Sequence, residues 1–131
     1  LREIYLAGLR ALAPQDMEGI RVMVTLGPTR EHWDGLRFWT NPSTGTMGAA
    51  VAVAAWLRGA RVEAVCGPGT PWLPAGIARH NVGSARHMLE AVTTGGASAA
   101  LIASIVHYGQ YSIRQCKEYM AAHGASVRLT W

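Results

Sequence analysis

Cysteine is scarce in this sequence. Only Cys66 and Cys116 occur among its 131 residues, and they lie far apart. This excludes a disulfide-rich secreted scaffold, so we interpret both as reduced core thiols of a cytoplasmic protein. The five histidines do not follow the spacing of metal ligands either. We therefore expect no zinc site and no other metal held by the protein itself.

Long apolar runs are also absent. No run reaches the roughly 18–20 residues that a membrane span needs, and no basic and then apolar leader opens the sequence. We therefore expect no membrane association. Half of the residues are apolar, which excludes a disordered chain and suffices for the core of one domain. Because the sequence begins with Leu1 rather than methionine, we expect a fragment or a processed piece.

Lysine is almost missing. Eleven of the twelve basic residues are arginine, Lys117 is the exception, and the formal net charge is +4. The arginine guanidinium suits planar recognition of phosphate or carboxylate through two parallel hydrogen bonds. The basic residues are scattered, however, without the clustered stripe that nucleic-acid binding requires. We therefore expect a small anionic ligand and no nucleic acid.

Alternating apolar and turn-forming segments predict an α/β fold, a Rossmann-like three-layer sandwich with a mostly parallel sheet. Two versions of this prediction stay open, a complete sheet and an incomplete one. The predicted elements are helices at 1–13, 46–58 and 85–93, and strands at 20–26, 61–66 and 77–82. We expect residues 1–18 to be a helix and linker from an upstream domain. Residues 19–131 would form the Rossmann-like nucleotide-binding domain.

Two alternatives fit residues 97–131. Apolar residues between 102 and 120 recur at helical spacing, which predicts one long helix. The apolar run at 99–106 is equally typical of a buried parallel strand, followed by a helix from near Ser112 to Gly124. Residues 125–131 are a further candidate strand.

Small and hydroxyl-bearing residues gather between the first predicted strand and the helix that follows it. Open α/β sheets hold phosphates at such junctions, where backbone N–H groups and the helix N-terminus favour an anion. The Walker ending and the pattern G-x-G-x-x-G are both missing, so spacing alone favours phosphate binding and an ordinary connection equally. The candidate binding residues are Gly27, Pro28, Thr29, Ser43, Thr44, Gly45, Met47 and Gly48.

The loop between these two groups contains further polar side chains. Arg37 and Asn41 lie where they could reach a bound phosphate, although a lone asparagine is more often a turn former. Glu31 and Asp34 could act as an acid pair or hold magnesium through water. A solvated or salt-bridged loop is the more frequent outcome for such a pair.

A longer pattern of spaced residues runs through the same segment. It comprises Val24-Thr25, Gly27-Pro28-Thr29, Glu31, Trp33-Asp34, Leu36-Arg37, Trp39, Asn41, Ser43-Thr44-Gly45 and Met47-Gly48. With this pattern, Gly19–Val92 resembles the phosphopantothenate–cysteine ligase (phosphopantothenoylcysteine synthetase) family. In bacteria that domain is usually the carboxyl-terminal half of a bifunctional coenzyme A biosynthesis flavoprotein. Pro42, Thr44 and Thr46 replace the arginine, serine and lysine of the family's asparagine motif.

The resemblance implies that residues 19–131 are a ligase domain that uses CTP and magnesium. The carboxylate of 4′-phosphopantothenate would attack CTP, giving an acyl-cytidylate and pyrophosphate, and the amine of cysteine would then displace CMP to form an amide. The two glycine loops would hold phosphates, Asn41 would orient the acyl-cytidylate, and Arg37 would support the loop or the charge. The family also implies a homodimer or higher oligomer with sites shared between subunits.

Two other functions fit the sequence. A non-catalytic nucleotide-binding or assembly module of the same fold is favoured because the family's downstream lysine-rich loop is not visible here. An NAD(P)-binding oxidoreductase domain is disfavoured by the missing dinucleotide pattern. The three functions predict different assay results. A ligase binds and consumes CTP, a non-catalytic module only binds CTP, and an oxidoreductase domain binds NADP.

Overall fold

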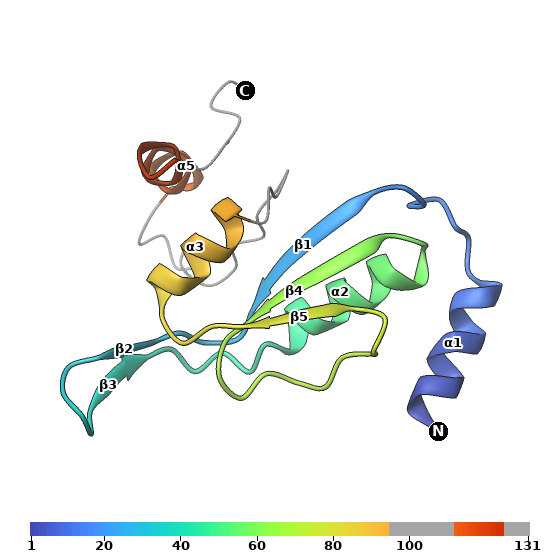
Figure 1. The fold of residues 1–131 in the computed structure, drawn as a ribbon, viewed down its shortest axis with the longest axis horizontal. Coiled ribbons are helices and arrows are strands. Elements are labelled where there is room, and N and C mark those ends of the chain that lie inside the picture. Colours follow the sequence, from blue (N-terminus) through green and yellow to red (C-terminus); the bar gives the residue numbers. More distant parts are fainter. Residues whose placement is uncertain (95–111, 125–131) are drawn as a thin grey trace.

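A parallel sheet, with three strands among the described residues, forms the centre of the fold. The computed structural model describes residues 1–94 and 112–124. Its main sheet has the order β1 (Arg21–Leu26), β4 (Arg61–Cys66) and β5 (Ala78–Asn81), and both neighbouring pairs are parallel. All three carboxyl ends meet at one edge, on the left in Figure 1. This confirms the predicted α/β fold with its parallel sheet.

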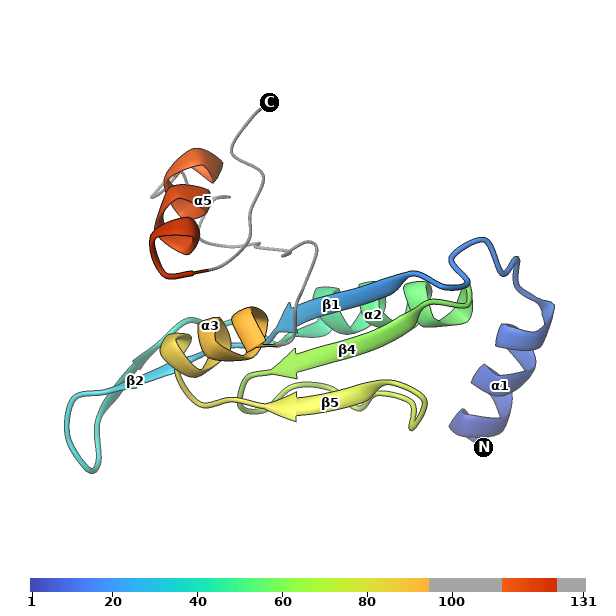
Figure 2. The same cartoon turned by 45° about the horizontal axis from the view of Figure 1, so that its top comes forward.

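The helix α2 (Thr46–Leu57) connects β1 to β4 and lies behind the sheet in both ribbon views (Figures 1 and 2). Its buried face consists of small residues, among them Ala49, Ala52 and Ala55. These pack against Val24 of β1 and Val62 of β4. Because small side chains let a helix approach a sheet closely, the alanine-rich sequence fits this position in the core.

A β-hairpin that the sequence did not predict projects from the carboxyl edge of the sheet. Its strands are β2 (Arg30–His32) and β3 (Phe38–Thr40), paired antiparallel. We predicted a polar loop there, which is wrong. Every residue of both strands is exposed, so the sequence carries no alternation of buried and polar residues that could indicate a strand. A stacked pair of rings, Trp33 and Trp39, lies at the hairpin tip, with their centroids 6.0 Å apart.

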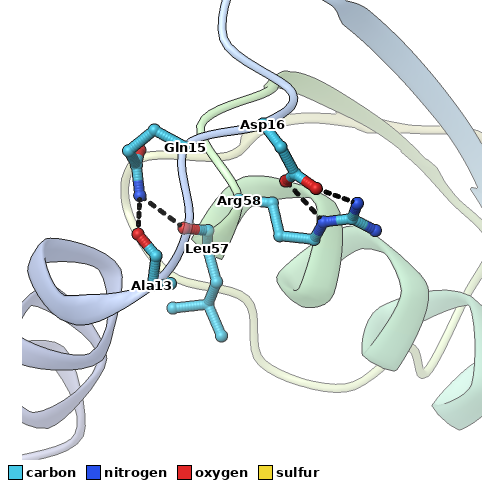
Figure 3. A network of polar contacts seen from close by, with 5 residues as sticks. All are labelled: Ala13, Gln15, Asp16, Leu57 and Arg58. Atoms are coloured by element: carbon cyan, nitrogen blue, oxygen red, sulfur yellow. Dashed lines mark hydrogen bonds and ion pairs between the residues drawn. The ribbon is translucent and has the colours of Figure 1, made fainter.

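The helix α1 (Arg2–Leu12) lies at the opposite end of the sheet, as Figure 1 shows. The linker that follows it, which includes Gln15 and Asp16, contacts the carboxyl-terminal end of α2, as Figure 3 shows. Gln15 donates hydrogen bonds to the carbonyl oxygens of Ala13 and Leu57, and Arg58 forms an ion pair with Asp16. Residues 1–18 therefore contact the sheet domain directly; their origin in an upstream domain stays a prediction.

Asp16 gives this linker a testable dependence on pH. Hydrogen bonds from the Arg58 guanidinium hold the pKa of the Asp16 carboxyl below its ordinary value. The Asp16 carboxyl thus binds a proton less readily in the folded chain than in the unfolded chain. Its ion pair with Arg58 therefore stabilises the fold at neutral pH, and this stabilisation is lost below about pH 4. We expect the Tm of Asp16→Asn to fall less than that of the parent between pH 6 and pH 3. Equal falls in thermal unfolding experiments would contradict the assignment.

Two helices of the described residues follow the sheet. The helix α3 (Ala85–Thr94) begins after Ser84, whose Oγ accepts a hydrogen bond from the His87 N–H at 3.2 Å in the manner of an N-cap. The helix α5 (Ile113–Ala122) begins at Ser112, where the backbone is extended. One long helix over 102–120 is therefore wrong, and the later start near Ser112 is confirmed. The candidate strands at 99–106 and 125–131 lie outside the described residues.

None of the helices in the described ranges 1–94 and 112–124 is long and apolar enough to cross a membrane. Cys66 is a buried free thiol, as predicted, whereas the free thiol of Cys116 is only half-buried.

Candidate functional site

Three loops meet at the carboxyl edge of the sheet. The first follows β1 at Gly27, the second enters α2 at Gly45, and the third follows β4 at Gly67. The Gly67 N–H donates a hydrogen bond of 2.8 Å to the carbonyl oxygen of Leu26, which ties the first loop to the third. The strand-to-helix junction predicted from the sequence is thus one side of a meeting point of three backbone segments.

Glycine allows these segments to touch. Gly27 and Gly45 both have left-handed backbone, with φ of 83° and 72°, which a side chain makes costly. A Cβ on Gly45 would lie 3.0 Å from the backbone nitrogen of Gly27 and 3.1 Å from the Cγ2 of Thr70. A Cβ on Gly67 would lie 1.8 Å from the carbonyl oxygen of Pro28. Hence the loops form a tightly packed backbone surface.

Gly48 continues this packing inside α2. A Cβ there would lie 2.5 Å from the Cβ of Leu26 on β1. Glycine is therefore what lets the first turn of the helix rest on the strand. The candidate residues Gly27, Pro28, Gly45 and Gly48 are brought together, whereas the side chain of Met47 is exposed.

The first turn of α2 is rich in hydroxyl groups but has no conventional cap. Gly45 is the N-cap residue and offers no side-chain hydrogen bond to the helix. Thr44 instead bonds to the neighbouring hydroxyl of Thr46 at 2.8 Å, and the Ser43 Oγ accepts from the Gly45 N–H at 3.3 Å. Since the first N–H groups of a helix lack partners within it, this end is suited to binding an anion.

Asn41 forms a turn just ahead of these hydroxyls. Its Oδ1 accepts a hydrogen bond of 3.0 Å from the Ser43 N–H, so the side chain shapes the entry into the helix. On the other side of the loop, the Thr40 hydroxyl donates to the carbonyl oxygen of Thr29 at 2.8 Å. The hairpin thereby connects the Gly-Pro-Thr loop with the segment that carries Asn41.

Arg37 lies in the turn at the hairpin tip rather than in the meeting point of the glycine loops. Its guanidinium forms an ion pair with Asp34 at 2.6 Å and lies 5.3 Å from the ring centre of Trp33. Asp34 also accepts hydrogen bonds from the N–H groups of Leu36 and Arg37. These backbone bonds and the guanidinium lower the pKa of the Asp34 carboxyl.

Glu31 and Asp34 do not form an acid pair. Glu31 accepts a hydrogen bond of 2.8 Å from the Ala85 N–H at the start of α3, whereas Asp34 is occupied by its own turn and by Arg37. Within 1–94 and 112–124, no three His, Cys, Asp or Glu side chains could together hold a metal ion.

The structure adds Thr70 and Arg79 to the site, which the sequence did not single out. The Thr70 methyl group covers the space beside Gly27 and Gly45. Arg79 on β5 donates to the Thr70 hydroxyl and, at 3.1 Å, to the carbonyl oxygen of Pro71. Cys66 lies beneath this pair, and burial raises the pKa of its thiol, which Arg79 and Thr70 partly oppose. Nothing local in the sequence indicates these contacts.

Comparison with known proteins identifies relatives of this arrangement. A family model described as the DNA/pantothenate metabolism flavoprotein C-terminal domain matches residues 17–129. The chain is 47% identical over 79 residues to the coenzyme A biosynthesis bifunctional protein CoaBC of Vibrio parahaemolyticus, which is 60% of this chain and 20% of that protein. It is also similar to the crystal structure of the C-terminal domain of CoaBC, with a TM-score of 0.64 and 39% identity over 69% of this chain and 47% of that one.

A different enzyme also matches part of the chain. The imidazole glycerol phosphate synthase subunit HisF of Desulfovibrio desulfuricans is 84% identical over 55 residues, which is 42% of this chain and 21% of that protein. The chain thus spans about a fifth of the length of these two curated relatives and about half of the solved domain.

Proposed function

Because the chain belongs to the family of DNA/pantothenate metabolism flavoprotein C-terminal domains, we propose that it carries the nucleotide-binding part of a phosphopantothenate–cysteine ligase. In this reaction the carboxylate of 4′-phosphopantothenate attacks the α-phosphorus of CTP and releases pyrophosphate. The amine of cysteine then attacks the acyl-cytidylate and releases CMP. The observation that carries the proposal is the meeting of the three glycine loops at the first turn of α2.

In this proposal the phosphates lie against the first turn of α2. The N–H groups of that turn and the hydroxyls of Ser43, Thr44 and Thr46 supply donors, and the helix end favours negative charge. Gly27, Pro28 and Thr29 form the opposite side. The close approach of the loops supports this role, because backbone donors reach an anion best where no side chain intervenes.

Asn41 is the residue we propose to orient the acyl-cytidylate. Its Oδ1 is engaged by the Ser43 N–H, which leaves the amide N–H₂ group as the donor available to a ligand. Arg37 pairs with Asp34, and we assign it a positioning role in the hairpin turn. Its support for the developing charge would therefore act through the loop rather than through direct contact.

The cofactor and partners follow the same proposal. Magnesium would be held mainly by the triphosphate, since the described residues offer no carboxylate cluster. The partners would be CTP, 4′-phosphopantothenate and cysteine, in a cytoplasmic homodimer or higher oligomer. A non-catalytic nucleotide-binding module is the second candidate, favoured by Thr46, which stands where the family's asparagine motif has lysine.

Pyrophosphate release tests the proposal and the role of Asn41 together. With CTP, magnesium and 4′-phosphopantothenate, we expect release that Asn41→Ala lowers at least tenfold, because both the turn and the amide donor are lost. Asn41→Asp is the matched variant, since it keeps an oxygen for the Ser43 N–H. If it remains as slow as Asn41→Ala, the amide donor is required; if it recovers, Asn41 is only a turn former.

Cysteine and CTP binding distinguish the two candidate functions. CMP release that requires cysteine would show that both half-reactions take place. CTP binding without pyrophosphate release would favour the non-catalytic module. The absence of both binding and release would refute the assignment of a nucleotide site.

A further inference from the structure

The carboxyl-terminal helix α5 stands apart from the sheet. Both ribbon views show it beyond α3, away from β1, β4 and β5 (Figures 1 and 2). Among the described elements, α2 packs extensively on β1 and β4, whereas α5 has no comparable contact with the sheet. Ile113 and Tyr119 on α5 are exposed. This helix therefore adds little to the core that holds the three glycine loops.

Local residues define both ends of α5. Ser112 and Gln115 form a reciprocal capping box: the Ser112 Oγ accepts from the Gln115 N–H at 3.2 Å, and the Gln115 Oε1 accepts from the Ser112 N–H at 2.8 Å. Gly124, with φ of 84°, follows the last turn. A helix closed at both ends by local residues does not need the sheet to define its limits.

The chain is similar to two different enzymes, CoaBC and HisF. The ligase pattern occupies residues 24–48, and the solved CoaBC domain resembles 69% of the chain. The HisF similarity is closer in identity, 84%, but covers only 55 residues. CoaBC and HisF are different enzymes, so a HisF segment is not expected to carry the ligase pattern. Outside residues 24–48, only the stretch 49–131 is long enough for 55 residues, so we place the HisF similarity there.

We infer that the chain joins segments of two protein families, and that α5, which lies in the HisF-type segment, folds independently of the nucleotide-binding sheet. The change from one family to the other lies between β4 and α5. Because 55 residues are more than the stretch 93–131 that follows the ligase resemblance, the two similarities overlap around β5 and α3. The start of α3 still contacts the hairpin through the bond from its Ala85 N–H to Glu31.

The alternative is a single family from end to end. The family model matches as far as residue 129 and so includes α5. In that case α5 belongs to the ligase domain, and its stability depends on the same core as β1 and β4. The two explanations thus differ in a measurable property, the coupling between α5 and the sheet. This coupling does not depend on whether the chain binds CTP.

Hydrogen exchange on the full chain measures the coupling. Val62 of β4 is buried in the core, and Val62→Ala leaves a cavity there. We expect exchange of the β1, β4 and α2 amides to become about tenfold faster, with α5 unchanged within about twofold. Ser112→Ala removes the capping box, and we expect the reverse: faster exchange in α5 and an unchanged sheet.

Parallel changes in both regions, with either variant, would overturn the inference, as would loss of protection in both at one denaturant concentration. Full exchange of α5 in the parent while the sheet remains protected would support it. Repeating the measurement with CTP keeps the two proposals apart. Absence of protection by CTP at residues 27–29 and 43–48 refutes the nucleotide site, whereas the comparison of α5 with the sheet is unaffected.

Discussion

Gly67→Ala is expected to unfold the sheet domain or to lower its free energy of unfolding by at least about 3 kcal/mol, the upper end of the cost of overpacking. The added Cβ would lie 1.8 Å from the carbonyl oxygen of Pro28 and 2.9 Å from its carbonyl carbon. Both are backbone atoms, so relief requires the loops after β1 and β4 to separate. Urea unfolding followed by circular dichroism measures the loss.

Gly83→Ala is the matched control for this substitution. It adds the same methyl group to a loop glycine, but the nearest atom is the His87 Nδ1 at 3.8 Å, an ordinary contact. We expect its stability to change by no more than about 0.5 kcal/mol. If both variants unfold at the same urea concentration as the parent, the close packing of the Gly67 and Pro28 backbones is wrong.

Gly45→Ala is expected to weaken CTP binding at least tenfold. Gly45 has left-handed backbone at the N-terminus of α2, and the Cβ would lie 3.0 Å and 3.2 Å from the N and Cα of Gly27. The left-handed conformation alone costs about 1–2 kcal/mol with a side chain. The crowding adds to this cost and pushes apart the two loops proposed to hold the phosphates. Isothermal titration calorimetry with CTP and magnesium measures the affinity.

Gly19→Ala separates the cost of the left-handed backbone from the crowding between the loops. Gly19 also has left-handed backbone, with φ of 79°, but it precedes β1 at the opposite end of the sheet, and a Cβ there would meet nothing within 4 Å. We expect a similar conformational cost in stability with CTP affinity unchanged. Equal losses of affinity in Gly19→Ala and Gly45→Ala would mean that general destabilisation, and not the loop geometry, controls binding.

The secondary structure around the sheet could be predicted because its signals are local. Val22, Val24 and Leu26 describe a strand, the alanines after Gly48 describe a helix, and Gly59 marks its end. These elements appear within one or two residues of their predicted bounds. The start of α5 at Ser112 is local too, because serine and glutamine three residues apart form the cap without help from other elements.

The hairpin could not be predicted in the same way. Its strands are short and exposed on both faces, so no buried side defines a period of two. What fixes it is a set of contacts with distant residues, such as the bond from the Arg30 N–H to the carbonyl oxygen of Gly83. The roles of Asn41 and Arg37 diverge for this reason: one side chain shapes the entry to α2, whereas the other belongs to the hairpin tip.

The sequence by itself determined the α/β class, the order of the strands and helices around α2, and the family to which the loop pattern belongs. These properties depend on spacing and composition within short segments. Only the tertiary structure decided which loops meet. The contact of Thr70 with Gly27 and Gly45, the support of Thr70 by Arg79, and the closeness of Gly67 to Pro28 join residues far apart in the chain. Such contacts follow from how a sheet aligns the carboxyl ends of its parallel strands, which no local pattern specifies.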